Sequence, residues 1–530
     1  MNKLWSSAAL LTTVLLSMHP AAAQVLTVTV TGGKLAGVLA DGIVAYKGIA
    51  FAAPPIGALR WKPPQPVVAW QGTRKADTYG PSCVQDPTFA RLFGAPPAIS
   101  EDCLYLNVWT PATSAADKLP VMVWIYGGGF VGGMTSVPAY DGAHFAHRGV
   151  VLVSVAYRLG AFGFLAHPEL SRESGNGSGN YGIEDQIAGL RWVKANIAKF
   201  GGDPSRVTIF GESAGGISVS MLAASPLAKG LFQRAISESG GSFAPAHRDA
   251  EGGENVPPLS VAEASGQKFL AKLGVSHIEE ARALSADTLQ KAVGPGLQAD
   301  FWPVFDGHVL LGDQYELYEA GHFNDTPVLI GTNSDEGALF VQSMTAAMFE
   351  SSIRKGYGAK ADAILAVYPH ATDAEALQAA RDTARDSLFG WHTWAWARLQ
   401  SQKGKGMAYV YYFDHRTPQS PHGASHGSEI GYVFGNLGGF GGGPAGLSGP
   451  PRREDTATSE LMMSYWVNFA KNGDPNGAGL PAWPAFRHSS QQVMYIDGKS
   501  GARPLPNRPQ LDALDGYYAW RRQEAKRAHD

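Results

Sequence analysis

The sequence is poor in cysteine, in unbalanced charge and in long apolar runs, and each shortage excludes a class of protein. Two cysteines among 530 residues exclude a disulfide-dense miniprotein and cannot build a thiolate zinc site. With 43 Lys and Arg against 46 Asp and Glu, the formal charge of -3 leaves no positive excess for binding DNA or RNA. Beyond the first residues, no apolar run is long enough to form a transmembrane helix.

Neither an internal repeat nor a low-complexity linker divides the chain. Apolar residues make up 45% of it, which is enough for a large buried core. Chain length alone suggests about three domains. Because no linker is found, we predict a single elaborated domain over residues 24–530.

The first 23 residues have the pattern of a secretory signal peptide. Lys3 gives a positive start, residues 4–16 are largely apolar, and Ala21 and Ala23 form an A-x-A ending. We predict cleavage after Ala23 and export of the protein, so that it is secreted or periplasmic. The alternative is an uncleaved membrane anchor.

Export also gives a meaning to the two cysteines. In an oxidising compartment, an even pair at short range is most simply a disulfide, so we predict a bond between Cys83 and Cys103. Closing a loop of this length is worth about 3 kcal/mol on the chain-entropy model. Two separate buried thiols are the alternative.

Four continuous apolar runs predict strands that are buried on both faces. Such runs are typical of a parallel sheet covered by helices, because a strand with one exposed face alternates apolar and polar residues. An amphipathic helix is predicted over residues 185–200, and helical spacing recurs over 260–300 and 345–405. Together these patterns predict an α/β fold with a mostly parallel central sheet and helical insertions above it. The four runs are residues 119–126, 150–157, 207–210 and 328–331.

Three other segments predict local structure outside this sheet. Residues 25–30 alternate apolar residues with Thr and are followed by two glycines, which indicates the start of a hairpin. Residues 52–66 are rich in proline and are expected to be irregular. Residues 435–451 are rich in glycine and proline, which predicts a surface loop.

The pattern G-x-S-x-G, which marks a sharp strand-to-helix turn carrying a nucleophilic serine, occurs twice. Ser213 follows the apolar run 207–210 and precedes residues 217–224, which can form a helix. Ser425 follows a segment with two prolines, which preclude a central strand. We therefore predict Ser213 as the nucleophile and interpret the match at Ser425 as chance.

A glycine-rich loop directly follows the first of the four runs. The glycines at 127–129 let backbone N–H groups approach a ligand closely. A tetrahedral intermediate needs such donors at its oxyanion, and we predict that the N–H groups of Gly128, Gly129 and Ala214 supply them. The alternative, a nucleotide-phosphate loop, lacks the Lys-Ser/Thr pair that should follow the glycines.

These two motifs, together with four others, resemble the type-B carboxylesterase family, which includes cholinesterases and bacterial and fungal carboxylesterases. Residues 101–107 match its E-D-C-L-x-L-N signature, and residues 179–186 match its G-N-x-G-x-x-D-Q segment. Residues 200–204 lead into the serine turn as in the family, and residues 466–476 match near the end. The resemblance runs from about residue 33 to residue 485 and implies an α/β-hydrolase fold.

The resemblance also implies the other two members of a Ser-Glu-His triad. The family's acid lies in G-x-N-x-D-E-G, here residues 331–337, which implies Glu336, with Asp335 as the alternative. The family's base precedes E-I-x-Y-V-F-G, which implies His426, with His422 as the alternative. The order nucleophile, acid, base is that of the α/β-hydrolases.

Three further residues are implied to support the base. The resemblance suggests that Glu212 and Glu429 lie near His426 and help to hold its charged form, and that Ser239 joins that network. Ordinary solvated carboxylates are the alternative for both glutamates, because exposure is the usual state of Glu.

Departures from the family pattern bear on the substrate. Cholinesterases carry a tryptophan for the quaternary ammonium inside the first disulfide loop, whereas residues 83–103 contain none, so we do not expect a choline site. Phe389 and Trp391 lie near the segment where the family lines its acyl pocket, and Phe130 ends the glycine loop. These three aromatic residues are our candidates for substrate contacts, with core packing as the alternative.

The sequence thus predicts a secreted or periplasmic serine carboxylesterase that acts on a small-molecule ester without a cofactor or a metal. Metal catalysis is disfavoured because the motif H-E-x-x-H does not occur. A non-catalytic adhesion or binding protein with the same fold is one alternative. A lipase that acts at an oil–water interface is the other.

Overall fold

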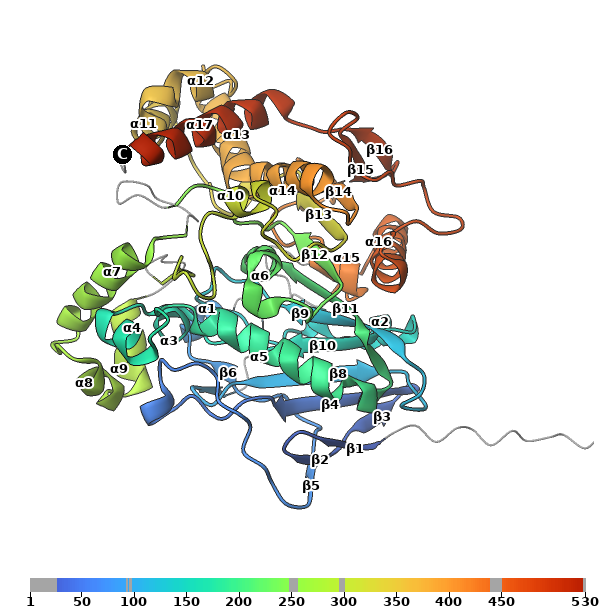
Figure 1. The fold of residues 1–530 in the computed structure, drawn as a ribbon. Coiled ribbons are helices and arrows are strands. Elements are labelled where there is room, and N and C mark those ends of the chain that lie inside the picture. Colours follow the sequence, from blue (N-terminus) through green and yellow to red (C-terminus); the bar gives the residue numbers. More distant parts are fainter. Residues whose placement is uncertain are drawn as a thin grey trace, which may run out of the picture.

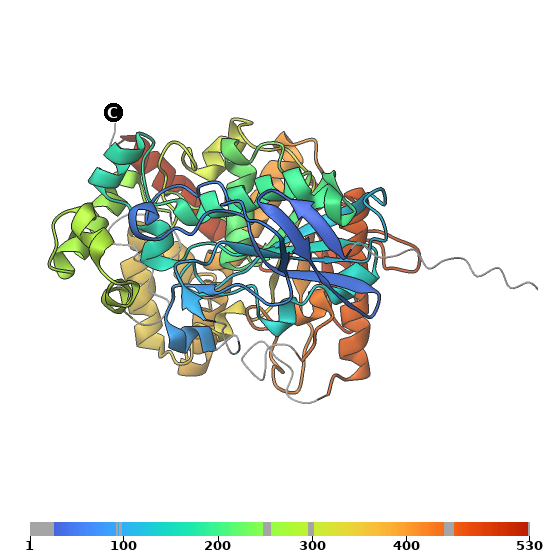
Figure 2. The same cartoon turned by 90° about the horizontal axis from the view of Figure 1, so that it is seen from below.

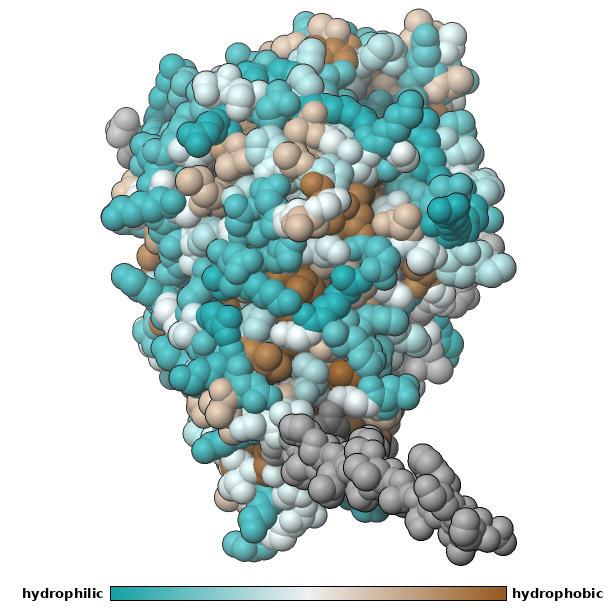
Figure 3. Space-filling view, turned by 90° about the vertical axis from the view of Figure 1, so that its right-hand side faces the viewer, coloured by the Kyte–Doolittle hydropathy of each residue, from teal (hydrophilic) through white to brown (hydrophobic). Residues whose placement is uncertain are grey.

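The computed structural model describes residues 26–527 except 92–93, 95–97, 247–255, 295–300 and 439–449. The predicted signal peptide and most of the predicted loop at 435–451 lie outside the described residues. Within the described part of the chain, no helix combines the length and the apolar character needed to cross a membrane. The face in Figure 3 is mostly hydrophilic, with small apolar patches separated by polar side chains.

An eleven-stranded sheet runs through the centre of the molecule (Figure 1). Its seven middle strands are parallel to their neighbours from β10 to β15, and antiparallel strands complete both edges. The fold is therefore the predicted mostly parallel α/β sheet. In order across the sheet, the strands are β16 (Gly501–Pro504), β15 (Gln492–Ile496), β14 (Ala408–Phe413), β13 (Val328–Asn333), β12 (Arg234–Glu238), β11 (Gly202–Glu212), β9 (Leu119–Ile125), β10 (Val151–Val155), β8 (Tyr105–Thr110), β4 (Ile43–Ala50) and β3 (Val38–Ala40).

The four predicted runs form β9, β10, β11 and β13. Nearly all of their apolar residues are buried, because helices cover both faces of the sheet. Helices α5 (Tyr181–Asn196) and α6 (Ala214–Ala224) lie on one face, and α2 (Ala143–His147) and α16 (Arg453–Asn472) lie on the other (Figures 1 and 2). This arrangement places the carboxyl ends of the parallel strands at one edge of the core, where loops can carry functional residues.

The predicted helical regions also form, as groups of shorter helices. Those in the first region lie beside the small helices α3 (Gly160–Phe164) and α4 (Pro168–Ser174), and those in the second lie beyond the ends of the central strands (Figure 1). The first group is α7 (Leu259–Lys272), α8 (Ile278–Ala283) and α9 (Ala286–Val293); the second is α11 (Ala346–Tyr357), α12 (Ala361–Leu365), α13 (Asp373–Arg385) and α14 (Trp391–Lys403). The remaining helices are α1 (Pro87–Ala90), α10 (Gln314–Glu319) and α15 (Ile430–Phe434).

The last described helix, α17 (Arg508–Arg527), reaches back to a segment far away in the sequence. Arg521 donates to the carbonyl oxygen of Ala246 over 2.8 Å, and Arg522 donates to that of Phe243 over 2.5 Å. Arg522 also pairs with Asp313, which caps α10. Helix α17 therefore holds the segment 243–246 in place.

The hairpin predicted at residues 25–30 is present as β1 (Thr27–Val30) and β2 (Gly33–Ala36), and β5 (Thr73–Lys75) extends it on the β2 side. Residues 52–66 contain only a short turn of helix, as expected for a proline-rich segment.

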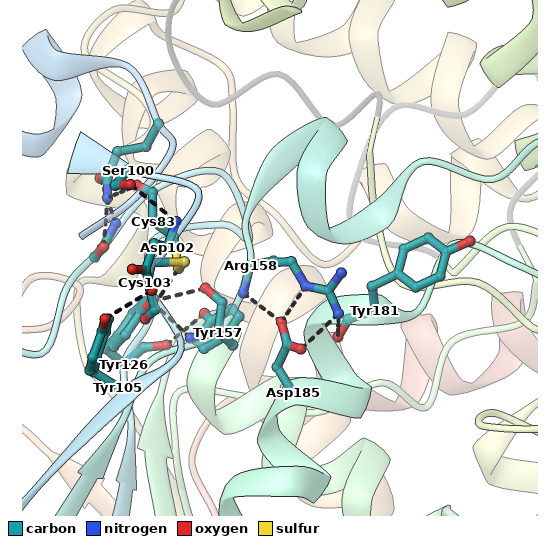
Figure 4. The surroundings of a disulfide bond; sticks show 12 residues. Cys83, Ser100, Asp102, Cys103, Tyr105, Tyr126, Tyr157, Arg158, Tyr181 and Asp185 are labelled. Atoms are coloured by element: carbon teal, nitrogen blue, oxygen red, sulfur yellow. Dashed lines mark hydrogen bonds and ion pairs between the residues drawn. A yellow bond between two sulfur atoms is a disulfide. The ribbon is translucent and has the colours of Figure 1, made fainter. Parts of the chain in front are cut away.

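A second small element joins β6 (Ser82–Cys83) to β7 (Ile99–Ser100), where the sulfur atoms of Cys83 and Cys103 lie 2.05 Å apart (Figure 4). Charged and polar residues tie this region to the body of the protein. Asp102 accepts from the hydroxyl of Tyr105, and Glu101 forms a 2.6 Å ion pair with Arg60. The E-D-C motif therefore has a structural role beside the cysteines.

Candidate active site

Ser213 lies at a strand-to-helix turn, as its sequence context predicts. It stands between the end of β11 and the first residue of α6, with φ 54° and ψ -125°, a region that non-glycine residues seldom adopt. The turn needs glycine on both sides, because a Cβ at Gly211 would lie 2.5 Å from the carbonyl oxygen of Ile125 and one at Gly215 would lie closer still. The half-buried Ser213 is thereby raised at the edge of the core.

Ser425 has none of this context. It lies in the loop between β14 and α15, and it pairs with Asp335 through an isolated bridge outside any strand. Its carbonyl oxygen accepts a hydrogen bond from the side-chain amide of Asn333 over 2.9 Å. The second G-x-S-x-G match therefore lies beside the predicted base without forming a strand-to-helix turn.

The predicted base and acid are in direct contact. His426 Nδ1 lies 2.6 Å from Glu336 Oε2, and both side chains are buried. Glu336 follows β13, and His426 lies in the loop after β14, so two neighbouring strands bring them together. The alternatives do not take these places: Asp335 pairs through its backbone with Ala424, and His422 is exposed.

Glu336 is held by donors on its other oxygen. Oε1 accepts from the Ser239 hydroxyl over 2.5 Å and from the backbone N–H of Asn333 over 2.7 Å. Together with the contact to His426, these hydrogen bonds hold the carboxylate of Glu336 in one orientation. Glu336 is thus placed to accept a hydrogen bond from the Nδ1–H group of His426. This hydrogen bond would fix the orientation of the imidazole ring.

Glu429 and Ser239 join the same network. The side-chain amide of Asn333 donates to Glu429 Oε2 over 2.5 Å, and the hydroxyl of Ser239 lies 3.4 Å from Glu429 Oε1. Both Glu429 and Ser239 are completely buried. Glu429 is therefore not the ordinary solvated carboxylate that we considered as the alternative.

Glu212 lies on the opposite side of the imidazole ring. Its Oε1 is 3.2 Å from His426 Nε2, and its side chain is buried. Because Glu212 directly precedes Ser213, this contact places Nε2 next to the serine turn. His426 thus has a carboxylate at each ring nitrogen.

The burial of these groups changes their proton affinities. Burial, with the carboxylate of Glu336, raises the pKa of Glu212 to about 7, against the lowering effect of His426. Burial, with the charges of Glu212 and Glu336, raises the pKa of Glu429 to about 8. Burial alone would lower the pKa of His426, but the carboxylates of Glu212 and Glu336 raise it to about 10. The site therefore favours a protonated imidazole.

The predicted oxyanion donors lie on two elements that meet at the serine. Gly128 and Gly129 have φ of 110° and 63° and follow β9, the strand next to β11. Among the described residues, no group accepts a hydrogen bond from the N–H of either glycine. Ala214 is the first residue of α6, where the N–H has no partner within the helix. The loop packs on the serine turn, since a Cβ at Gly127 would lie 2.9 Å from the Cβ of Ser213.

Tyr126, which directly precedes the three glycines, fixes the start of the glycine loop. Its ring stacks on that of Tyr157, with centroids 4.6 Å apart, and each hydroxyl hydrogen-bonds to the other residue's backbone (Figure 4). The next residue, Arg158, forms a buried 2.8 Å ion pair with Asp185 of α5. The D-Q motif is thus connected to the glycine loop through this ion pair.

The three aromatic candidates lie in different surroundings. Phe389 stacks on His426, with ring centroids 4.6 Å apart and planes 18° apart. Phe130 is fully buried against Phe164 and Trp302. The prediction that Trp391 contacts substrate is not supported by its position.

Trp391 is fully buried and faces α17, where its indole N–H donates to Asp515 and its ring packs on Tyr518. It could reach a substrate only if this part of the core were repacked. The physical reason is that residues two positions apart on a helix point to nearly opposite sides, so Trp391 faces α17 while Phe389 faces His426. The alternative of core packing therefore describes Trp391.

Two residues that the sequence prediction did not single out also contact the site. Phe340 lies over His426 with ring centroids 5.3 Å apart and remains 38% exposed, so it borders the accessible side of the base. Asn333 holds Glu336, Glu429 and the loop of His426 together. Its position within the motif G-x-N-x-D-E-G was the signal in the sequence that could have identified it.

Among the described residues, no cluster of three or more potential ligands could hold a metal ion.

The comparisons agree with this geometry. The sequence model of the carboxylesterase family matches residues 24–513. Fumonisin B1 esterase from Sphingopyxis macrogoltabida is 37% identical over 490 residues, which cover 87% of this chain and 85% of that protein. Para-nitrobenzyl esterase from Bacillus subtilis is 35% identical over 497 residues, which cover 89% of this chain and 95% of that protein.

Solved structures of similar proteins have the same fold. A PNB esterase superposes with a TM-score of 0.78 at 34% identity, over 92% of this chain and 99% of that one. A thermophilic PNB esterase superposes with a TM-score of 0.81, also at 34% identity and with the same coverage. The central sheet and its helices are therefore those of an α/β-hydrolase.

Proposed function

Since the chain belongs to the carboxylesterase family and is a carboxylic ester hydrolase, we propose that Ser213, His426 and Glu336 carry the reaction through an acyl-enzyme. The observation that supports this most directly is the buried 2.6 Å contact between His426 and Glu336 beside the turn of Ser213. A serine hydroxyl needs a base, and the base needs an orienting carboxylate.

The first half of the proposed reaction forms the acyl-enzyme. Ser213 Oγ attacks the ester carbonyl carbon while its proton passes to His426 Nε2, and the proton on Nδ1 stays hydrogen-bonded to Glu336. The carbonyl oxygen becomes an oxyanion that accepts from the N–H groups of Gly128, Gly129 and Ala214. When the tetrahedral intermediate collapses, the bond to the alcohol oxygen breaks and Nε2 returns its proton to that oxygen.

The second half uses the same groups in reverse. Water attacks the acyl carbon, His426 Nε2 takes its proton, and the oxyanion forms again in the same donors. Collapse of this intermediate breaks the bond to Ser213 Oγ, which recovers a proton from Nε2 while the carboxylic acid leaves. No cofactor enters either half.

We propose neutral, small-molecule esters as substrates. Fumonisin B1 esterase and para-nitrobenzyl esterase are similar proteins whose names give fumonisin B1 and para-nitrobenzyl esters as their substrates. At this site, the partly exposed ring of Phe340 borders the base. The sequence at 83–103 has no tryptophan to bind a quaternary ammonium.

A matched pair of esters tests this choice. We expect the protein to hydrolyse 3,3-dimethylbutyl butyrate at least as fast as butyrylcholine, because the two alcohols have the same shape and only choline is charged. Initial rates at equal concentrations give the comparison. A choline ester turned over faster than its neutral counterpart would contradict the proposed pocket, and an abrupt rise in rate above the solubility limit would favour an interfacial lipase.

We also propose that residues 1–23 are removed and that the mature chain is exported with Cys83 and Cys103 bonded. The support is the pattern of the first 23 residues and the position of the two sulfur atoms. One domain from residue 24 to residue 530 fits this proposal, since strands from residue 38 to residue 504 join a single sheet.

The mass of the exported protein tests both parts of that proposal. We expect a chain that begins at Gln24 and is lighter by two hydrogen atoms than its fully reduced form. Reduction should also lower the melting temperature, because the bridge removes about 3 kcal/mol of chain entropy from the unfolded state. A chain that still begins at Met1, or two free thiols after oxidative export, would argue against the respective part.

The two carboxylates beside His426 determine the expected pH dependence. Because they raise the pKa of His426 above its ordinary value of 6.5, the base loses its proton only at higher pH, and kcat/KM should rise with pH beyond 6.5. In Glu212→Gln one of these charges is gone, so the rise should move to lower pH. We expect this shift in pH profiles of kcat/KM, with Glu184→Gln on α5 as a control whose profile stays in place. An unchanged profile in Glu212→Gln would contradict the proposed coupling.

A further inference from the structure

Glu238 is a fully buried acid that has no part in the proposed reaction. It is the last residue of β12, and its side chain has no measurable exposure. Oε1 accepts from the indole N–H of Trp466 on α16 over 2.7 Å, whereas Oε2 has no hydrogen-bond partner among the described residues. Keeping a carboxyl group charged in the core costs free energy when it has so few hydrogen-bond donors.

The backbone around Glu238 contacts both the nucleophile and the acid of the triad. The carbonyl oxygen of Glu238 accepts from the N–H of Ser213 over 2.9 Å, directly at the strained turn. The next residue, Ser239, has φ 48°, donates its N–H to Gly331 and donates its hydroxyl to Glu336. The dipeptide Glu238–Ser239 is therefore a common support for Ser213 and Glu336.

The surrounding charges bear on the ionisation of Glu238. Glu212, Glu336 and Glu429 are three other buried acids of the same region, and His426 is the base that faces two of them. Glu336 has three donors, whereas Glu238 has only the neutral indole of Trp466. Burial, together with the carboxylates of Glu429 and Glu212, holds the pKa of Glu238 well above its usual range.

We propose that Glu238 is a positioning residue which stays a neutral carboxylic acid and, through its hydrogen bond with Trp466, fixes the Glu238–Ser239 dipeptide under Ser213 and Glu336. This inference rests on the proposed function of these two residues. A neutral acid accepts the indole N–H as an amide would, and it adds no charge to the surroundings of His426. The geometry of the nucleophile then depends on a contact from α16, on the far face of the sheet.

A pair of substitutions at Glu238 tests the two parts of the proposal. Glu238→Leu removes the acceptor of Trp466, and we expect kcat to fall about tenfold or more, the scale of one lost hydrogen bond, with little change in KM. Glu238→Gln keeps an oxygen for the indole and should restore kcat to within about twofold of the parent, with the same pH profile. If Glu238 is ionised instead, Glu238→Gln removes a negative charge near His426 and moves the rise of kcat/KM to lower pH, which overturns the neutral form.

Two tryptophans of the same core provide a matched control. Trp483 is buried next to Trp466, with ring centroids 6.4 Å apart, and its indole N–H donates to the backbone of Val410. Trp466→Phe should lower kcat, whereas Trp483→Phe should not, even if both lower the melting temperature equally. Equal kcat in the two variants would overturn the positioning role of Trp466 and Glu238.

Covalent labelling separates this inference from the proposed function. A fluorophosphonate probe should modify the parent protein at Ser213, and the rate of labelling should be lower in Trp466→Phe. If the parent is not labelled at Ser213, the proposed function fails. If the parent is labelled and Trp466→Phe reacts at the same rate, only the inference about Glu238 fails.

Discussion

Ser213→Ala is expected to lower kcat by about 10⁴-fold or more, the scale of losing a triad nucleophile. The hydroxyl is the atom that would form the acyl-enzyme, and no other described group occupies a comparable strand-to-helix turn. Binding and the oxyanion donors would remain, so a small residual rate above that of water is expected. Steady-state hydrolysis of a p-nitrophenyl ester measures the loss, after circular dichroism has shown that the variant is folded.

Ser425→Ala is the matched control, because it removes a hydroxyl from the same local pattern without the same geometry. We expect it to keep most of the activity, with a loss on the order of 1 kcal/mol at most if its hydroxyl helps to place the neighbouring His426. An inactive Ser425→Ala beside an active Ser213→Ala would overturn the assignment of the nucleophile.

Glu336→Gln is expected to lower kcat by up to roughly 10⁴-fold, between the effects of the two serine substitutions. The amide keeps the size of the side chain but removes the charge that orients His426 and stabilises its protonated form. An amide N–H directed at Nδ1 would also favour the wrong tautomer of the imidazole. The oxyanion donors would be intact, so the loss should appear in kcat while KM changes little.

Asp335→Asn provides the comparison for this substitution. Asp335 is the neighbouring carboxylate and our alternative for the acid, but its pairing in the structure is through the backbone with Ala424. We expect Asp335→Asn to retain most of the activity. The reverse result, with Asp335→Asn impaired and Glu336→Gln active, would exchange their roles.

The strands that could be predicted from the sequence are those that consist of consecutive apolar residues. Strands β9, β10, β11 and β13 show such runs. Strand β12, which carries Glu238, reads Arg-Ala-Ile-Ser-Glu and shows no run, because its polar side chains are buried by partners distant in sequence. Glu238, which supports the site from β12, could therefore not be found from local sequence.

The aromatic residues near the active site are a second case in which local sequence does not determine what a side chain contacts. Phe389 and Trp391 are two positions apart in one aromatic stretch, yet one stacks on His426 and the other packs on α17. Residues two positions apart on a helix point to nearly opposite sides, so only one of the two can face His426. Which side of the helix faces the active site depends on its packing against α17 and the loop of His426, and local sequence does not give that packing.

The two hydrogen bonds from α17 to residues 243–246 have a consequence for the order of folding. Arg522 and Phe243 are 279 positions apart, and Arg521 and Ala246 are 275 apart. Contacts of such large sequence separation form late, because a long loop must close before they contribute. As the chain leaves the ribosome, the segment 243–246 is made long before α17 can bind it.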